Sequence, residues 1–380
     1  MMTKLRVLHA SPTWFSPTSV VGGGERWVDN VRLALSAGAP EIEQAMVAIG
    51  EEPEVSLRGQ SLVRVLPNQR GLRTPMDAVS SYLWREFENF DVVHVHQSLT
   101  DFGAYACCVA ASLGKTVVLT DLGGGASPIM LQGGLAMADG IVSISRYAHA
   151  MIASSVRSDS LIISGPIDTD KFVPAATKPA NPSAICVSRI MPHKGIDRLI
   201  KALPAGLKLK VVGRVYHDAY RAFLGELARG KDVEFIHDAQ DDDLLGLYQS
   251  SSVFLQASCI TDVYGSVQLK TELMGLTTLE AMSCGLPVVV SSDGGSLPEL
   301  VTDAQFGAVF TNQDELQSLL TRHMAGFWPV TTASSAARAH VIQAAGLVGY
   351  GQRLGTFYAK VHAQKIKSLQ GKSVAHSYSQ

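Results

Sequence analysis

The chain lacks any long run of positive charge. Its 32 lysines and arginines are balanced by 34 aspartates and glutamates, so the formal net charge is −2. Proteins that bind nucleic acid usually gather basic residues on one face or in one run to meet the phosphates. The composition therefore argues against nucleic acid as the main partner.

Cysteine is scarce, and the spacings typical of metal and redox sites are missing. The five cysteines are Cys107, Cys108, Cys186, Cys259 and Cys284, and no two of them form a C-x-x-C pair. Most lie in apolar runs, which favours buried free thiols in a reducing compartment. His193, His217 and His237 also lack metal-ligand spacing. We expect neither a metal nor an organic cofactor.

Long apolar runs are absent as well. The run at 104–113 ends before Gly114 and falls short of the roughly 18–20 residues that a helix needs to cross a bilayer. The first ten residues lead directly into a strand pattern without the features of a signal peptide. We therefore expect a cytoplasmic protein and leave open a peripheral contact at the inner membrane face.

What the chain does contain is a regular alternation of strand and helix patterns. Its 380 residues exceed one ordinary core, and 46% hydrophobic with 17% charged residues is typical of a folded α/β protein. In the first half, strands are predicted at 5–10, 44–49, 62–66, 91–95, 116–120, 140–144 and 161–163. Helices are predicted at 25–37, 75–87, 103–113, 131–138 and 146–154. This alternation predicts a parallel sheet covered on both faces.

The pattern changes near the middle of the chain. Gly165-Pro166 begins a connector, and 174–182 is rich in Pro, Ala and Lys without periodicity, so we place a hinge at 165–182. A second series of strands is predicted at 184–188, 207–212, 233–236, 253–256, 287–291 and 308–310, with helices at 195–203, 219–229, 242–250 and 277–284.

These patterns predict two Rossmann-like, doubly wound α/β domains that face each other across a cleft, since such folds bind ligands at the carboxyl ends of their strands. The predicted domains span 1–165 and 166–333. Helices at 334–370 are expected to pack back across the hinge, and 371–380 is expected to be a flexible tail.

The stretch from Glu272 to Glu280 carries the most chemical information. Two carboxylates lie eight positions apart and flank Gly275 and the start of a predicted helix. Carboxylates accept hydrogen bonds from sugar and ribose hydroxyls. A helix N-terminus offers free backbone N–H groups to a phosphate. This one segment could hold the sugar, ribose and phosphate parts of a nucleotide sugar.

Several islands occur together with this stretch and in a defined order. They are Gly22-Gly23-Gly24-Glu25, Asp91-Val-Val-His-Val-His96, Ser143-Ile-Ser145, Pro166-Ile-Asp168-Thr-Asp-Lys-Phe172, Ser188-Arg189, Lys194-Gly195, Val211-Val-Gly213 and Asp293-Gly294-Gly295-Ser-Leu-Pro-Glu299. By these islands the chain resembles the retaining, nucleotide-sugar-dependent glycosyltransferases of family four, which have the GT-B fold. The resemblance extends over nearly the whole chain.

The resemblance implies that the second domain holds the donor. Arg189 and Lys194 would neutralise the diphosphate, because arginine can bind two oxygens and lysine supplies a compact charge. Glu280, in the first turn of its helix, would bind the ribose, and Glu272 would bind the transferred sugar. The diphosphate would lie close to Gly213 and Gly275 and to the backbone N–H groups of Leu276, Thr277 and Thr278. The alternatives are a solvated pair of cations and ordinary helix capping.

In the first domain, the resemblance implies that Gly23 and Gly24 close over the donor phosphates and that Glu25 lies near the donor or acceptor sugar. His96 would end a strand at the cleft, with His94 on the opposite face. A structural role for His96 is the alternative. Asp121 stands where many relatives have a His-Asp pair, and it could orient the acceptor in place of the missing histidine.

Three further features have less specific interpretations. Asp168-Thr-Asp170 matches a metal-diphosphate motif of a different fold, and its place in the hinge favours a structural role. Asp241-Asp242-Asp243 is typical of a helix N-cap. The insertion 259–270 is either part of a lid or a surface loop.

The leading hypothesis is a metal-independent retaining glycosyltransferase that moves a sugar from a nucleoside-diphosphate sugar to an acceptor hydroxyl. A small molecule, a glycan or a lipid-linked glycan could be the acceptor. The alternatives are an isomerase or phosphorylase of the same fold and a non-catalytic nucleotide-sugar binder. The base, the sugar, the acceptor and the oligomeric state stay open.

Overall fold

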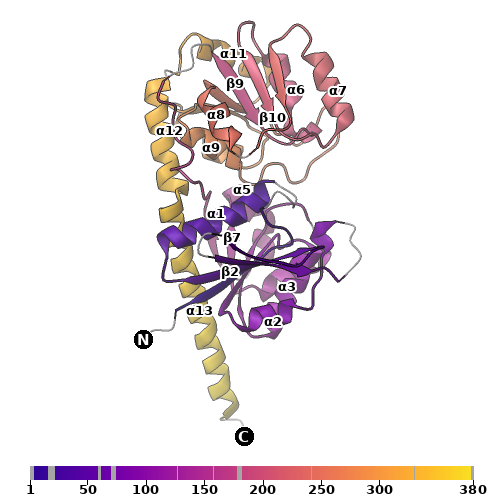
Figure 1. Cartoon of the computed structure of the whole chain (residues 1–380), viewed down its shortest axis with the longest axis vertical. Helices are drawn as coiled ribbons and strands as arrows, with labels where there is room; N and C mark the ends of the chain where they lie inside the picture. Colours follow the sequence, from indigo (N-terminus) through magenta and orange to yellow (C-terminus); the bar gives the residue numbers. More distant parts are fainter. Residues whose placement is uncertain are drawn as a thin grey trace. The chain divides into compact units, whose positions relative to one another are not determined.

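The chain forms two compact units (Figure 1). The first contains Met1–Pro166 and Gly346–Gln380, and the second contains Ile167–Ala345. The computed structural model describes residues 4–15, 22–58, 61–69, 74–125, 127–156, 158–177, 182–240, 242–328 and 330–377. No helix in these ranges is long and apolar enough to span a membrane.

The first unit is built on an eight-stranded sheet in the order β3-β4-β2-β1-β5-β6-β7-β8. Its strands are β1 (Arg6–Ala10), β2 (Glu43–Gly50), β3 (Glu54–Arg58), β4 (Ser61–Pro67), β5 (Val92–His96), β6 (Thr116–Thr120), β7 (Gly140–Ser143) and β8 (Asp159–Ile162). All pairs are parallel except β3 with β4. The seven predicted strands are confirmed. The prediction missed β3, an edge strand whose Val55 and Leu57 are exposed, so that it lacks a buried apolar face.

The helices of this unit are α1 (Gly23–Gly38), α2 (Leu83–Glu88), α3 (Asp101–Ser112), α4 (Pro128–Gln132), α5 (Arg146–Ile152) and α13 (Leu347–Ser377), with 3₁₀ turns at Pro75–Asp77, Gly134–Met137 and Ala153–Ser155. Two helix predictions were wrong. The predicted helix 75–87 is interrupted, because the N–H groups of Val79 and Ser81 bond to the side chains that follow β4. The predicted helix 131–138 is interrupted at Gly133, where two adjacent glycines disfavour helix.

Helix α13 packs directly on α1 within the first unit. A Cβ atom at Gly351 would meet the Ala34 carbonyl, and one at Gly38 would meet the Val348 carbonyl, so two glycines allow this close approach. Helix α12 (Val330–Ala345) belongs to the second unit, and Gly346 separates it from α13. Helix α13 continues to Ser377, into the stretch 371–380 that was expected to be a tail.

The second unit has a fully parallel six-stranded sheet in the order β11-β10-β9-β12-β13-β14. Its strands are β9 (Ser183–Val187), β10 (Lys208–Val212), β11 (Val233–Ile236), β12 (Val253–Gln256), β13 (Val288–Ser291) and β14 (Gly307–Phe310). All six were predicted, within one or two residues at their ends. Counted from β9, the order is 3-2-1-4-5-6, the doubly wound arrangement in which the connections reverse direction between β9 and β12.

The helices of the second unit are α6 (Ile196–Ala202), α7 (Asp218–Leu227), α8 (Asp243–Gln249), α9 (Leu276–Ser283), α10 (Leu297–Leu300), α11 (Gln313–Met324) and α12. Helices α10 and α11 were not predicted. The signal for α11 was present, since Leu316, Leu319, Leu320 and His323 are buried at helical spacing. A continuous apolar core lies between the sheet and helices α6, α7 and α11.

Candidate functional site at the carboxyl edge of the second sheet

The loops after β9 and β12 bring polar side chains together where the second sheet reverses direction. Arg189 follows β9, and Gln256 is the last residue of β12. Lys194 ends a 3₁₀ turn and is followed by Gly195, whose φ of 62° is a conformation that side chains other than glycine rarely adopt. A Cβ atom at Gly195 would overlap the Ala257 carbonyl. Glycine at this position therefore lets the loop that contains Lys194 (the lysine loop) pack against the backbone that follows β12.

Glu272 is the centre of this group. Its Oε2 atom accepts hydrogen bonds from Lys194 Nζ at 2.6 Å, Gln256 Nε2 at 2.9 Å and Ser258 Oγ at 3.2 Å. Within the described part of the chain, Oε1 has no hydrogen-bond donor. About a fifth of the side chain is exposed, at 20%. One carboxylate oxygen is thus saturated, and the other remains for a ligand hydroxyl.

The charge of Glu272 is set by its neighbours. Burial raises the pKa of its carboxyl, but the Lys194 charge, the bonds from Lys194 and Ser258, and the more distant Arg189 charge together hold this pKa below its ordinary value. Glu272 is therefore an anion that only accepts hydrogen bonds. Burial and the charges of Lys194 and Arg189 lower the pKa of His193 to about 4, so its imidazole is neutral at pH 7.

The two predicted cations differ in exposure. Arg189 is exposed, and its guanidinium lies 5.7 Å from the centre of the Tyr216 ring. Lys194 is buried and paired with Glu272. Three of the four groups expected to converge thus lie around one point. Lys194 is the main charged partner of the Glu272 carboxylate.

Helix α9 begins beside this group at Leu276. Its N-cap, Gly275, has φ 82°, in the left-handed region where glycine is favoured. The Thr278 N–H already bonds to the Gly275 carbonyl, and the Thr278 side chain is buried. The expectation that Thr278 faces a phosphate was therefore wrong. In the described residues, the N–H groups of Leu276 and Thr277 are the first-turn donors without a backbone acceptor.

Glu280 lies elsewhere than predicted. It falls in the second turn of α9 rather than the first, because the helix begins at Leu276. Its side chain is 0% exposed, and its Oε2 accepts a hydrogen bond from the Tyr248 hydroxyl at 2.9 Å. Glu280 therefore has no surface open to a ribose in this structure. The sequence gives no indication of Tyr248, which comes from α8.

Two glycine-containing segments support the site from behind. The loop after β13 packs against the backbone of Glu272, where the Ser296 N–H donates to the Glu272 carbonyl. Gly295 in this loop has φ 71°, and a Cβ atom at this position would overlap the Glu272 carbonyl. Asp293 in this loop pairs with Arg198 at 2.9 Å and 3.3 Å. Gly213, after β10, lies against the Ser188 carbonyl in the same way, so a close approach of backbones explains this glycine.

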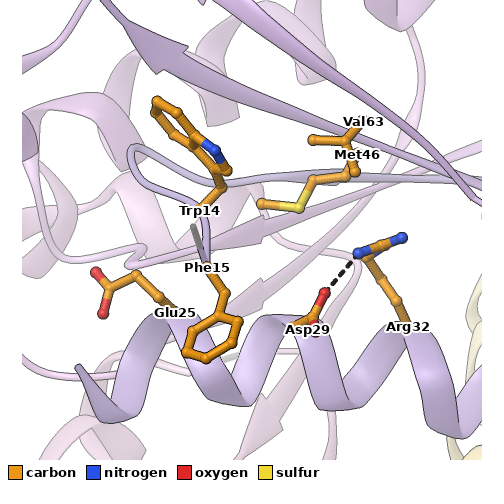
Figure 2. Close-up of a pocket in the computed structure, with 7 residues that line it drawn as sticks. All are labelled: Trp14, Phe15, Glu25, Asp29, Arg32, Met46 and Val63. Carbon is orange, nitrogen blue, oxygen red and sulfur yellow. Dashed lines mark hydrogen bonds and ion pairs between the residues drawn. The ribbon is translucent and has the colours of Figure 1, made fainter. Parts of the chain in front are cut away.

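In the first unit, the predicted glycine island begins α1. Gly24 lies against the Gln97 side-chain amide, and Glu25 is buried and accepts a hydrogen bond from Thr13 Oγ1 at 2.6 Å. Figure 2 shows Glu25 beside a small crevice that is also lined by Trp14 and Phe15. The crevice continues along α1 to the ion pair between Asp29 and Arg32, at 2.7 Å.

His96 ends β5 as predicted, but it is buried rather than open to solvent. His94 and His96 share a face, because residues two apart in a strand point the same way, so placing His94 on the opposite face was wrong. His9 of β1 joins them, with its Nδ1 atom 3.1 Å from His96 Nε2. Trp27 of α1 covers this group. Burial, reinforced by charges on neighbouring groups, lowers the pKa of all three imidazoles, to about 3 for His9.

The potential ligand atoms of His9, His94 and His96 lie within 4.8 Å of one another. Both ring nitrogens of His94 are already bonded, one to the Tyr358 hydroxyl at 2.6 Å and one to Thr120 Oγ1 at 2.7 Å. The His9–His96 contact thus joins β1 to β5, and the separate hydrogen bonds of His94 join β5 to β6 and α13. Sequence reasoning missed the group because it depends on the β1–β5 register, which places His9 beside His94.

The remaining predicted features have local structural explanations. Asp121 is half-buried, and its Oδ1 accepts a hydrogen bond from Gly123 N at 3.1 Å. Asp168 Oδ1 accepts from the backbone of Asp170 and Lys171, which agrees with a structural role in the connector. Asp242 precedes α8 without a side-chain cap, and Asp241 lies outside the described residues. Four cysteines are buried and free as expected, whereas Cys108 is exposed.

The insertion 259–270 is an ordered hairpin. Thr261 pairs with Val267 across it, and Asp262 closes the turn by accepting hydrogen bonds from Tyr264 N and Ser266 N. Cys259 N donates to the His193 carbonyl, which ties the hairpin to the lysine loop. The hairpin therefore leads directly into Glu272.

Two Rossmann-like units, one of them with polar groups gathered at its carboxyl edge, define a protein of the GT-B fold. Residues 168–325 match the family model described as Glycosyl transferases group 1. The fold is thus that of the GT-B glycosyltransferases, and this part of the second unit is similar to glycosyl transferases of group 1, in line with the sequence motifs.

Similar proteins agree with this assignment. Over 196 residues the chain is 31% identical to the GDP-mannose-dependent alpha-(1-6)-phosphatidylinositol monomannoside mannosyltransferase of Mycolicibacterium smegmatis, a match that covers 47% of this chain and 50% of that protein. The aligned region thus spans about half of each sequence.

Two solved structures share the fold over nearly their full length. A sucrose-phosphate synthase from Thermosynechococcus elongatus has a TM-score of 0.72 at 18% identity, covering 95% of this chain and 100% of that one. Anabaena HepE in complex with UDP has a TM-score of 0.72 at 17% identity, covering 94% and 100%.

Proposed function

We propose that this protein is a glycosyltransferase that transfers a sugar from a nucleoside-diphosphate sugar to an acceptor hydroxyl. One observation carries the proposal. Glu272, Lys194 and Arg189 gather at the β9–β12 edge beside the first turn of α9, so a carboxylate, two cations and free backbone donors adjoin one another. Each part matches one part of such a donor.

The sugar would bind to Glu272. Its Oε1 atom accepts from a sugar hydroxyl while Oε2 stays bonded to Lys194. The diphosphate would lie between Arg189 and the N–H groups of Leu276 and Thr277, where the partial positive end of α9 favours an anion. As the bond to the leaving diphosphate breaks, negative charge grows on its oxygens, and Arg189 stabilises that charge more in the transition state than in the ground state.

We further propose that transfer retains the anomeric configuration and needs no metal. With Arg189 and Lys194 at the site, protein cations can neutralise the diphosphate. Retention follows from the resemblance to family four, with the acceptor hydroxyl approaching on the leaving-group face and a donor phosphate oxygen taking its proton. In the first unit, Glu25 at the start of α1 is the acidic group proposed to lie near the donor or acceptor sugar.

A lipid-linked acceptor at a membrane surface is the favoured class. Four similar curated proteins are named for acting on phosphatidylinositol monomannosides. An acceptor of this kind would bring the protein to the inner face of a membrane as a peripheral protein. Water-soluble acceptors and a cytoplasmic location are the alternative.

Product analysis tests the proposal. The chain is incubated with UDP- and GDP-sugars and with lipid extracts or soluble sugars, and products are followed by mass spectrometry and NMR. We expect a new glycoside with the donor's anomeric configuration, formed equally well with a metal chelator present. Epimerised sugar or sugar phosphate would identify an isomerase or phosphorylase instead. Binding without turnover would identify a non-catalytic nucleotide-sugar binder.

A further inference from the structure

Two hydrogen bonds connect Thr278 of α9 to the Glu272 carboxylate, and a third joins this carboxylate to Lys194. Thr278 Oγ1 donates to Gln256 Oε1 at 2.6 Å, and Gln256 Nε2 donates to Glu272 Oε2 at 2.9 Å. Lys194 Nζ completes the chain at 2.6 Å from the same oxygen. Thr278 is 0% exposed and Gln256 is 3% exposed, so water does not compete for these bonds.

This chain determines which way the Gln256 amide points. A glutamine amide has one donating and one accepting end, and a threonine hydroxyl can serve either. If the amide were reversed, its oxygen would face the Glu272 carboxylate, placing two acceptors together in a buried site at a cost comparable to an unmade hydrogen bond. In the observed orientation, the Thr278 hydroxyl donates its hydrogen to the amide oxygen of Gln256. The NH₂ group is thereby directed at Glu272.

The position of Gln256 gives this chain its importance. It is the last residue of β12, one of the two strands between which the sheet reverses direction and beside which doubly wound folds bind ligands. Thr278 is the third residue of α9, directly after the two residues whose N–H groups are free. This series of hydrogen bonds therefore connects the start of α9, where the diphosphate is proposed to bind, to Glu272, where the sugar is proposed to bind. Its side chains, Thr278 and Gln256, do not reach the ligand.

We propose that Gln256 and Thr278 are positioning residues for donor-sugar recognition, an inference that rests on the proposed function. They hold the Glu272 carboxylate oriented so that Oε2 is saturated and Oε1 faces the transferred sugar, in register with the diphosphate on α9. Neither residue touches the substrate. Their loss leaves the diphosphate contacts intact and disturbs the carboxylate that binds the sugar.

The test compares Thr278→Val with Thr278→Ser. Valine keeps the shape of threonine but removes the hydroxyl, and serine keeps the hydroxyl. Loss of a hydrogen bond between two uncharged groups typically changes an equilibrium or a rate by roughly 2- to 13-fold. We expect Thr278→Val, acting through Gln256, to lower kcat about tenfold. Its affinity for the nucleoside diphosphate alone should stay within about twofold, and Thr278→Ser should restore transfer.

A second variant acts on the charge instead of the bond. Gln256→Glu places another carboxylate beside Glu272, and a neighbouring like charge raises the pKa of a carboxyl. The acid limb of the kcat profile should therefore move to higher pH. Thermal unfolding and circular dichroism of each variant confirm that the fold is intact.

Two outcomes would overturn the inference. In the first, Thr278→Val and Gln256→Glu transfer sugar with the wild-type kcat and pH profile. In the second, Thr278→Val and Thr278→Ser lose transfer and nucleoside diphosphate affinity to the same extent, which indicates a packing role only. A wild-type protein that neither binds a nucleoside diphosphate nor transfers sugar would overturn the proposed function itself, and this inference with it.

Discussion

The two sheets of this protein place different chemistry at similar positions. In the second unit, the β9–β12 edge holds a charged group in which Lys194 is buried, Glu272 is partly open to solvent and Arg189 is exposed. In the first unit, the β1–β5 edge holds His9 and His96, which are buried and neutral. Similar topology therefore provides a candidate ligand site in one unit and an internal hydrogen-bonded support in the other. The difference lies in burial, which removes charge from the imidazoles, and in pairing, which keeps it on Glu272.

The largest effect is expected for Lys194→Met. Breaking the pair leaves the Glu272 charge without its main partner, which should cost about 3–5 kcal/mol of unfolding free energy. Transfer should fall by roughly 150-fold or more, because both the diphosphate and the sugar contacts suffer. Chemical denaturation and initial rates measure the two effects.

The matched control for Lys194 is Lys208→Met, which breaks a half-exposed pair with Glu234. We expect its cost to stay within about 1 kcal/mol. Equal losses of unfolding free energy in the two variants would contradict the larger stabilisation expected from the Lys194–Glu272 pair.

Arg189→Ala sharpens the comparison by separating function from stability. The side chain is exposed and lies over the Tyr216 ring, so the free energy of unfolding should change by less than about 0.5 kcal/mol. Transfer should fall roughly 10- to 150-fold through lost diphosphate contacts. Arg229→Ala, at another exposed arginine, serves as the control. Wild-type kinetics in Arg189→Ala would contradict the phosphate role.

Tyr248→Phe tests whether Glu280 belongs to the interior of the second unit. Removing the hydroxyl deprives a fully buried carboxyl group of one donor, which should cost about 1–3 kcal/mol of stability. Nucleoside diphosphate affinity should change little. A stable variant with a large loss of affinity would instead place Glu280 in the donor site, as the sequence predicted.

The smallest effect concerns the histidines of the first unit. In the folded state, the pKa of His94 lies well below the value of about 6.5 that it has in the unfolded chain. At acidic pH the unfolded state therefore binds more protons than the folded state, so the free energy of unfolding decreases as the pH is lowered. Between pH 7.0 and pH 5.5, one such histidine accounts for about 1.3 kcal/mol. His94→Gln should reduce the measured pH dependence by that amount. An unchanged dependence would show that the pKa of His94 is the same in the folded and the unfolded protein.

Most of the fold could be predicted because it depends on local patterns. Thirteen strands were predicted from their apolar runs, and α1, α3 and α9 began within about two residues of the expected positions. The failures have local causes as well. Val79 and Ser81 bond to side chains of a distant segment, and the edge strand β3 has no buried face.

The candidate site could be predicted only in part. Motif spacing brought Glu272, Lys194 and Arg189 to one place, because each directly follows or precedes a recognisable strand or helix. It placed Glu280 in the first turn of α9, whereas the side chain lies in the second turn, buried and bonded to Tyr248 from another helix. It also overlooked Gln256, which looks like an ordinary strand residue. The β1–β5 register that joins His9 to His94 was equally invisible. Contacts across the tertiary structure decide these roles.

Hydrogen exchange with and without a nucleoside diphosphate tests the central claim most directly, because it reports on both units at once. If the charged edge of the second unit is the donor site, bound diphosphate protects the backbone amides around Arg189 and at the start of α9 most strongly. Amides of β5 around His96 are then unchanged. Strong protection of β5 without any change at α9 would contradict the assignment of the donor to the second unit.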